Sequence, residues 1–209
     1  METSAGGTTI GVITVEVKGL DLSLETAPSL FSPLRADRGT LAMLSCVDFA
    51  PGMRVLDLGC GCGLVGIAAA RLCGAENVVM CDIDPLAVEI AGRNAARNGV
   101  EGVKTAVSDG FAGLTDAGFD LILSNPPYQS DFSVAKGFIE KGFNRLKLGG
   151  RLVMVTKRRE WYRNKMIAIF GGVRIHEIDG YFVFEAERRD ARYANRGCLK
   201  TNRTREKKV

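Results

Sequence analysis

Hydrophobic and polar positions change their spacing along the chain, and this change indicates where strands and helices are expected. Val12–Val17 and Leu20–Glu25 alternate apolar with polar residues on either side of Lys18-Gly19, which predicts a short β-hairpin. From Met53 onwards, short apolar runs alternate with longer amphipathic stretches. That order predicts strands and helices in turn, the pattern typical of a parallel sheet covered by helices on both faces.

The individual elements follow from the same pattern. Strands are predicted at Arg54–Leu58, Asn77–Asp82, Val103–Val107, Phe119–Ser124, Arg151–Thr156, Val173–Ile178 and Tyr181–Ala186. Helices are predicted at Leu41–Phe49, Leu64–Cys73, Pro85–Asn98, Phe132–Leu146 and Glu160–Phe170. Gly149-Gly150 is expected to end the fourth helix, and Asp179-Gly180 is a hairpin turn signal that joins the last two strands.

These elements predict an α/β fold with a doubly wound, mostly parallel sheet of seven strands. An antiparallel C-terminal hairpin and a short N-terminal β-hairpin are expected to complete it. The N-terminal hairpin and its loop are assigned to residues 1–36, the main domain to residues 37–188, and a basic, disordered tail to residues 189–209. With 209 residues, 46% of them hydrophobic, the chain can form one domain with a full core.

Charge is distributed unevenly along the chain. The net charge is +4, yet nine Lys or Arg residues and only two acidic residues lie between Arg188 and Val209. The remainder of the chain therefore carries a charge of −3. A mildly acidic body with a basic tail is typical of contact with a phosphate backbone, and it is equally typical of a solvated terminus.

Composition also bears on location and redox state. No apolar run is long enough to span a bilayer, and the N-terminus lacks a secretion signal, so a cytoplasmic protein is expected. The six cysteines have neither zinc-site spacing nor the density of a disulfide scaffold, and we interpret them as reduced thiols without a bound metal. The single histidine, His176, lies in a predicted strand, where a structural role is favoured.

A glycine-rich loop follows the first strand of the predicted sheet. Three alternating glycines, Gly59, Gly61 and Gly63, lead from the strand into a helix, a place where ligands of open α/β sheets bind. The spacing differs from the G-x-G-x-x-G of dinucleotide sites. Asp57 directly before the loop would be unfavourable beside a pyrophosphate, but it suits a ligand with an ammonium or sulfonium group.

The next two strands also end in carboxylates. Asp82 stands about twenty residues after the loop, where a carboxylate can accept hydrogen bonds from both ribose hydroxyls. Asp84 is interpreted as the cap of the following helix, because Pro85 occupies the first helical position. Ile83 would pack on an adenine ring, and Asp109 would lie near its amino group.

The fourth strand ends in a stiff corner, Ser124-Asn125-Pro126-Pro127-Tyr128. The prolines hold Asn125 in extended geometry and provide no competing N–H donors. The Asn125 side-chain oxygen and the Pro126 carbonyl could each accept one hydrogen from a planar amine, while Tyr128 stacks on the ring that carries it. The alternative is an ordinary Pro-Pro turn with a surface tyrosine.

In this order, the motifs resemble those of class I S-adenosylmethionine-dependent methyltransferases that act on planar amino nitrogens. Leu30-Phe31-Ser32, Asp37-x-Gly39-Thr40 and Asp179-Gly180-Tyr181 narrow the resemblance to the methyltransferase small domain family, over roughly Ser29 to Arg188. That family includes the guanine-N2 methyltransferases of ribosomal RNA and small stand-alone relatives, and it implies a Rossmann-like methyltransferase sheet.

The resemblance implies the role of each motif. S-adenosylmethionine would lie with its methionine moiety over the three glycines and near Thr40, and its ribose would lie on Asp82. Its adenine would lie near Ile83 and Asp109, and the target amine on Asn125 and Pro126. The implied substrate is RNA, with the guanine N2 of ribosomal RNA as the first choice. A nucleobase would have to be single-stranded, looped out or flipped to reach the site.

Several alternatives remain open at this point. Guanine-N2 enzymes often carry N-P-P-F, whereas Tyr128 also suits adenine-N6 methyltransferases of RNA or DNA and glutamine-N5 methyltransferases of proteins. A cofactor-binding RNA assembly factor without turnover is a non-enzymatic alternative. An NAD-dependent oxidoreductase is disfavoured by the glycine spacing, and the chain could be a monomer or a homodimer.

A second basic segment follows the fifth strand. Lys157-Arg158-Arg159, together with Trp161, Arg163 and Lys165, could hold RNA phosphates at the same edge of the sheet. The same residues could equally form a solvated helix face.

Overall fold

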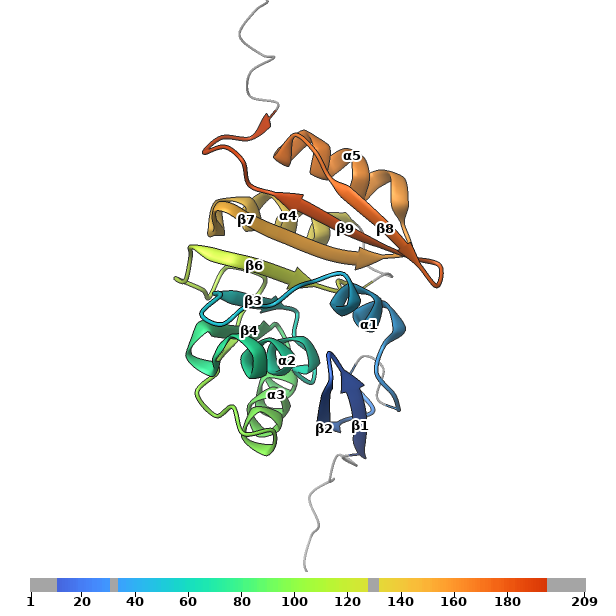
Figure 1. The fold of residues 1–209 in the computed structure, drawn as a ribbon, viewed down its shortest axis with the longest axis vertical. Helices are drawn as coiled ribbons and strands as arrows, with labels where there is room; N and C mark the ends of the chain where they lie inside the picture. The colour runs from blue at the N-terminus through green and yellow to red at the C-terminus, as the bar shows by residue number, and fades with distance from the viewer. Residues whose placement is uncertain (1–10, 31–33, 128–131, 195–209) are drawn as a thin grey trace, which may run out of the picture.

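The computed structural model describes residues 11–30, 34–127 and 132–194. Its centre is a seven-stranded sheet in the order β5-β4-β3-β6-β7-β9-β8 (Figure 1). The sheet strands are β3 (Val55–Leu58), β4 (Val78–Asp82), β5 (Lys104–Val107), β6 (Phe119–Ser124), β7 (Leu146–Thr156), β8 (Arg174–Ile178) and β9 (Tyr181–Glu187). The helices are α1 (Arg38–Ser45), α2 (Leu64–Cys73), α3 (Pro85–Arg97), α4 (Phe132–Arg145) and α5 (Arg159–Phe170), with a 3-10 turn at Ala75–Asn77. A separate hairpin pairs β1 (Gly11–Val17) with β2 (Leu20–Thr26).

Strand direction confirms the expected fold class. Strands β3 to β7 are parallel to one another, whereas β9 runs antiparallel to both β7 and β8. The turn between β8 and β9 has positive φ at Asp179 (52°) and Gly180 (77°), as the predicted two-residue hairpin turn requires. The parallel strands therefore bring their carboxyl ends to one edge of the sheet.

Alternating side chains divide the core into two layers. In β6, Leu121 and Leu123 pack with the residues of α1 and α2, whereas Ile122 between them packs with those of α4 and α5. Strand β7 repeats the alternation, because successive residues of a strand point to opposite faces. Helices thus cover both faces, as the sequence pattern predicts (Figure 1).

The N-terminal hairpin is attached to α3 by two asparagine side chains. Asn98 accepts from the Ser23 N–H (3.0 Å) and donates to the Ser23 carbonyl (2.8 Å). Asn94 makes the same pair of bonds with Glu25, at 2.7 and 2.9 Å. Each amide therefore pairs with the β2 backbone as a neighbouring strand would. Leu22 and Leu24 are fully buried beneath the hairpin, in the same core cluster as α2.

Two of the predicted helix boundaries are wrong. Helix α1 begins at Arg38 and ends at Ser45, because the Asp37 carboxylate caps it by accepting from the Thr40 N–H (2.8 Å). Helix α4 ends at Arg145, and Gly149-Gly150 lies inside β7 rather than at a helix end. Gly149 has a φ of 79°, and a Cβ on Gly150 would lie 2.6 Å from the Phe119 carbonyl oxygen. The glycine pair therefore lets β7 bend close against β6.

Two further predictions from the sequence concern membrane-spanning helices and the basic tail. No helix among the described residues is long and apolar enough to cross a membrane. The basic tail falls mainly on residues 195–209, outside the described residues.

Candidate active site

A cavity of about 380 Å³ lies at the carboxyl ends of β3, β4 and β6. Ile13 and Leu24 of the hairpin and Leu30 of the following loop line one side, and Val134 and Phe138 of α4 line another. Its volume is in the range of small-molecule sites. The N-terminal hairpin and α4 therefore enclose the edge of the sheet where the sequence motifs converge.

The glycine loop adopts a conformation that requires glycine. Gly59, Gly61 and Gly63 have φ values of 78°, 53° and 89°. A Cβ on Gly59 or Gly61 would meet no atom within 4 Å, so both glycines expose backbone to open space beside the cavity. Gly63 serves packing instead, because a Cβ there would lie 3.2 Å from the Ala91 Cβ of α3.

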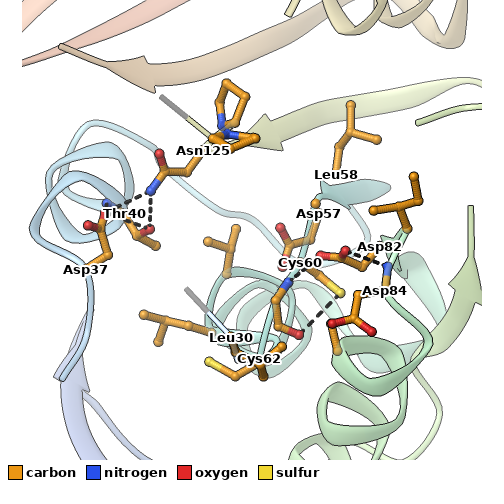
Figure 2. Close-up of a pocket in the computed structure, with 18 of the residues that line it drawn as sticks. Leu30, Asp37, Thr40, Asp57, Leu58, Cys60, Cys62, Asp82, Asp84 and Asn125 are labelled. Carbon is orange, nitrogen blue, oxygen red and sulfur yellow. Dashed lines mark hydrogen bonds between the residues drawn. The ribbon is translucent and has the colours of Figure 1, made fainter. Parts of the chain in front are cut away.

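Asp57 is a buried carboxylate at the bottom of the cavity (Figure 2). One of its oxygens, Oδ2, accepts from the Gly66 N–H of α2 at 2.8 Å. Burial, together with the nearby Asp82 carboxylate and against the effect of this hydrogen bond, raises the pKa of Asp57 to about 7. A cationic ligand in the cavity would favour the ionised form.

Asp82 connects the glycine loop with the start of α3. Its Oδ2 accepts from the Gly61 N–H (2.9 Å) and its Oδ1 from the Asp84 N–H (3.1 Å), as Figure 2 shows. Asp84 caps α3 through the Leu86 N–H (2.9 Å), which confirms its predicted role as a helix cap. Each carboxylate oxygen has two lone pairs, so both oxygens of Asp82 can accept a further donor from a ligand.

Ile83 and Asp109 lie at the outer part of the cavity. The Ile83 side chain is 64% exposed, although it is large and apolar, and it lines the cavity next to Asp82. Asp109 is exposed near the start of the loop after β5, two residues beyond the end of the strand. An exposed isoleucine beside carboxylates suits a flat ring with polar edges.

Asn125 is held by the turn that starts α1. Its Nδ2 donates to the Asp37 Oδ2 (2.8 Å) and to the Thr40 Oγ1 (2.9 Å). A carboxylate can only accept, so the NH2 group must face Asp37, and the amide oxygen lies on the opposite side (Figure 2). The side chain is thereby fixed with its acceptor directed away from α1. Pro126 and Pro127 line the same cavity.

The structure brings the flanking sequence motifs together. A Cβ on Gly39 would lie 2.8 Å from the Tyr181 ring, so this glycine allows the ring to pack against α1. Arg38 pairs with Asp179 in an exposed ion pair of 3.1 Å. The C-terminal hairpin therefore supports the turn that holds Asn125.

Most of the residues singled out in the sequence meet at this cavity. Its lining includes Thr40, Asp57, Gly59, Gly61, Asp82, Ile83, Asp109, Asn125, Pro126 and Pro127. Gly63 lies behind the loop, and Tyr128 falls outside the described residues. Cys60 and Cys62 also line the cavity, and burial raises the pKa of both thiols, as expected for unreactive side chains. The described cysteines form no disulfide.

The sequence did not reveal several contacts of this site. The bonds from Asn125 to Asp37 and Thr40 span 88 and 85 positions, and no local pattern reports such a contact. Asn94 donates to the Cys62 carbonyl of the glycine loop (2.9 Å) as well as holding β2. The available signal for Asn94 was its position at helical spacing from Ala87, Ile90 and Ala91, which puts a polar residue on the apolar face of α3.

Comparisons with known proteins show which sequences and folds the chain resembles. Residues 21–185 match the model of the methyltransferase small domain family. The ribosomal RNA small subunit methyltransferase C of Hahella chejuensis is 36% identical over 172 residues, which cover 80% of this chain and 50% of that protein. The protein of the same name from Serratia proteamaculans is 32% identical over 171 residues, covering 79% and 49%. The chain thus spans about half the length of the curated relatives it matches.

Solved structures show the same fold. The 16S rRNA N2 methyltransferase of T. thermophilus, in complex with AdoMet and guanosine, superposes with a TM-score of 0.81 at 25% identity. That match covers 90% of this chain and 53% of the other. A methyltransferase from Pyrococcus furiosus matches in fold, with a TM-score of 0.66 at 18% identity over 80% of this chain and 89% of the other.

Proposed function

The chain belongs to the methyltransferase small domain family, and on that premise we propose that it methylates an exocyclic amino nitrogen of RNA. S-adenosylmethionine is the proposed methyl donor, and the guanine N2 of ribosomal RNA is the proposed target. The observation that carries the proposal is that the Asn125-Pro126 corner and the glycine loop line one cavity. Support for the substrate comes from the relatives, which are named as ribosomal RNA methyltransferases.

The residues of the cavity fit this cofactor. The two carboxylates Asp57 and Asp82 can compensate its positive charges, and Asp82 retains acceptor capacity for ribose hydroxyls. Gly59 and Gly61 leave the backbone open to a close approach. When bound, S-adenosylmethionine supplies an electrophilic methyl group on a sulfonium centre. The apolar residues Ile13, Leu24 and Leu30 shield this end of the cavity from water.

The proposed chemistry depends on orientation rather than on a metal or a covalent intermediate. The Asn125 oxygen and the Pro126 carbonyl accept the two hydrogens of the target NH2 group, which turns its lone pair out of conjugation. Asp37 and Thr40 contribute by fixing the Asn125 amide. Transfer would break the bond between the methyl carbon and the sulfonium sulfur and leave a neutral thioether, and the methylated nitrogen would then release one proton to water. Fixed acceptors of this kind lower the barrier without reorganising during the reaction.

Labelled S-adenosylmethionine and undermodified ribosomal RNA, followed by nucleoside analysis, test the proposal. We expect N2-methylguanosine as the product. Label in a different methylated nucleoside would overturn the assignment to guanine N2, and label only in the glutamine side chains of an added protein fraction would overturn an RNA substrate.

The variant Asn125→Ala tests the role of the corner. We expect turnover to fall about 10²–10³-fold or more, because one fixed acceptor is lost. The dissociation constant for S-adenosylmethionine, measured by calorimetry, should stay within a few fold. Asn144→Ala is the matched control, since Asn144 on α4 contacts Glu140 and Tyr193 and does not line the cavity. Near-normal turnover of Asn125→Ala would disprove the assigned role.

A further inference from the structure

Two cations lie beside the corner that carries Asn125. Strands β6 and β7 are parallel, and their register pairs Ser124 with Met154. Continued past the strand ends, the same register brings Lys157 level with Pro127, and Arg158 follows it. Both side chains are exposed. Lys157 and Arg158 therefore stand at the edge of the sheet where the substrate is proposed to bind.

Lys157 and Arg158 are supported by aromatic rings rather than by carboxylates. The Lys157 Nζ lies 4.8 Å from the centre of the Tyr181 ring, and the Arg158 Cζ lies 5.0 Å from that of Phe132. Phe132 is in turn stacked on Trp161, with ring centres 4.3 Å apart and planes at 15°. Within the described part of the chain, neither cation forms an ion pair.

Neighbouring cations behave differently. Arg159 pairs with Glu160 at 2.9 Å, Lys165 pairs with Glu140, and Arg38 pairs with Asp179. Lys165, one of the residues considered for RNA contact in the sequence, is thus engaged in the fold and only 20% exposed. Lys157 and Arg158 differ because aromatic rings fix their positions and no carboxylate of the described residues pairs with them.

The placement of these cations is unfavourable for folding alone. Arg158 is the N-cap residue of α5 and makes no side-chain capping bond. Lys157, Arg158 and Arg159 place three positive charges at the helix end where the backbone dipole favours negative charge, and the first turn holds one acidic residue, Glu160, which pairs with Arg159. Serine, threonine, aspartate or asparagine is preferred at such a position. An anion bound beside the corner would relieve this repulsion.

We propose that Lys157 and Arg158 bind the phosphates that flank the target nucleotide of an RNA substrate. The inference rests on the proposed function and deepens it. The carboxylates Asp57, Asp82 and Asp109 line the cofactor end of the cavity and repel phosphate there, while the two cations attract it beside Asn125. This separation of charge orients the RNA strand, so that one base enters the cavity while the sugar-phosphate backbone stays at the edge of the sheet. A glutamine side chain of a protein would not need such a pair.

The experiment compares Lys157→Gln, Arg158→Gln and the double variant with wild type in RNA methylation. We expect the KM for RNA to rise about tenfold or more in the double variant, with an unchanged dissociation constant for S-adenosylmethionine. The slope of log affinity for RNA against log salt should become shallower by about 0.7–0.9 for each lost phosphate contact. Lys141→Gln, an exposed position on α4 that does not line the cavity, is the matched control for charge.

The outcomes separate the inference from the proposed function. If wild type methylates RNA and the double variant keeps the same KM and salt slope, the phosphate site is wrong and the proposed function stands. If Lys141→Gln raises the KM as much as the double variant does, the effect reflects overall charge, and the specific site is again wrong. If wild type methylates a protein and no RNA, the proposed function itself is overturned.

Discussion

At the scale of single residues, Asp57 shows that a residue of the site can reduce the stability of the folded protein. Its side chain is only 3% exposed, and burial raises its pKa to about 7 from an ordinary value of 3.8. The protonated carboxyl therefore contributes stability that is fully present below about pH 4 and is lost as the pH rises towards 7. Above pH 7 the folded protein holds a buried negative charge, which a cationic ligand would compensate.

Asp57→Asn should stabilise the protein at pH 8 and weaken its binding of S-adenosylmethionine. The asparagine oxygen can still accept from the Gly66 N–H, while the buried charge is removed. We expect the gain in unfolding free energy to be on the order of a few kcal/mol at pH 8 and clearly smaller at pH 5. Denaturant unfolding at both pH values measures this gain. Equal gains at both would contradict the ionisation of Asp57.

The same substitution should change the pH dependence of ligand binding. Wild type should bind S-adenosylmethionine more tightly as the pH rises through 7, because Asp57 becomes ionised. Asp57→Asn should lose this dependence on pH.

At the scale of elements, α3 connects the hairpin with the glycine loop. Asn94 and Asn98 both pair with the backbone of β2, but only Asn94 also donates to the Cys62 carbonyl. The two asparagines thus form a natural pair of variants. Variants of both asparagines lose bonds to the hairpin, but only a variant of Asn94 also loses the bond to the glycine loop. A comparison of the two variants therefore separates the effect of the hairpin from that of the loop.

Asn94→Ala and Asn98→Ala should both destabilise the fold, by roughly 1–3 kcal/mol, because each leaves buried backbone groups of β2 without a partner. Only Asn94→Ala should also raise the KM for S-adenosylmethionine several-fold, while kcat changes little, since the loop loses one of its supports. Thermal unfolding and steady-state kinetics measure the two effects. Similar KM values in both variants would show that Asn94 does not position the loop.

The boundaries of the helices and strands show how far the fold can be predicted from the sequence. The order of strands and helices was predictable because apolar periodicity is a local property, and the glycine loop and Asn125 follow directly from strand ends. The start of α1 was missed because the Asp37 cap is recognised only through its bond to Thr40. The Gly149-Gly150 pair is typical of a helix end in the sequence. In the structure it lies within a strand, where the close approach of β6 explains the glycines.

At the scale of the whole molecule, the cavity depends on segments that are distant in sequence. The hairpin, the loops after β3, β4 and β6, and α4 each contribute lining residues. The site residues could be predicted because each follows the end of a strand. The lining that the N-terminal hairpin contributes could not be predicted from such local patterns. Ile13 and Leu24 reach it only because α3 binds the β2 backbone.

A ligand in this cavity contacts both the hairpin and the sheet, so binding should stabilise the molecule as a whole. At a concentration 100-fold above its dissociation constant, S-adenosylmethionine should add about 2.7 kcal/mol and raise the Tm by about 5–10 °C. Asn125→Ala should keep this shift, because Asn125 is assigned to the substrate, whereas Asp57→Asn should reduce it. NAD should give no shift, since Asp57 precedes the loop where a pyrophosphate would lie. A larger shift with NAD would instead favour a dinucleotide site and contradict the assignment of the glycine loop to S-adenosylmethionine.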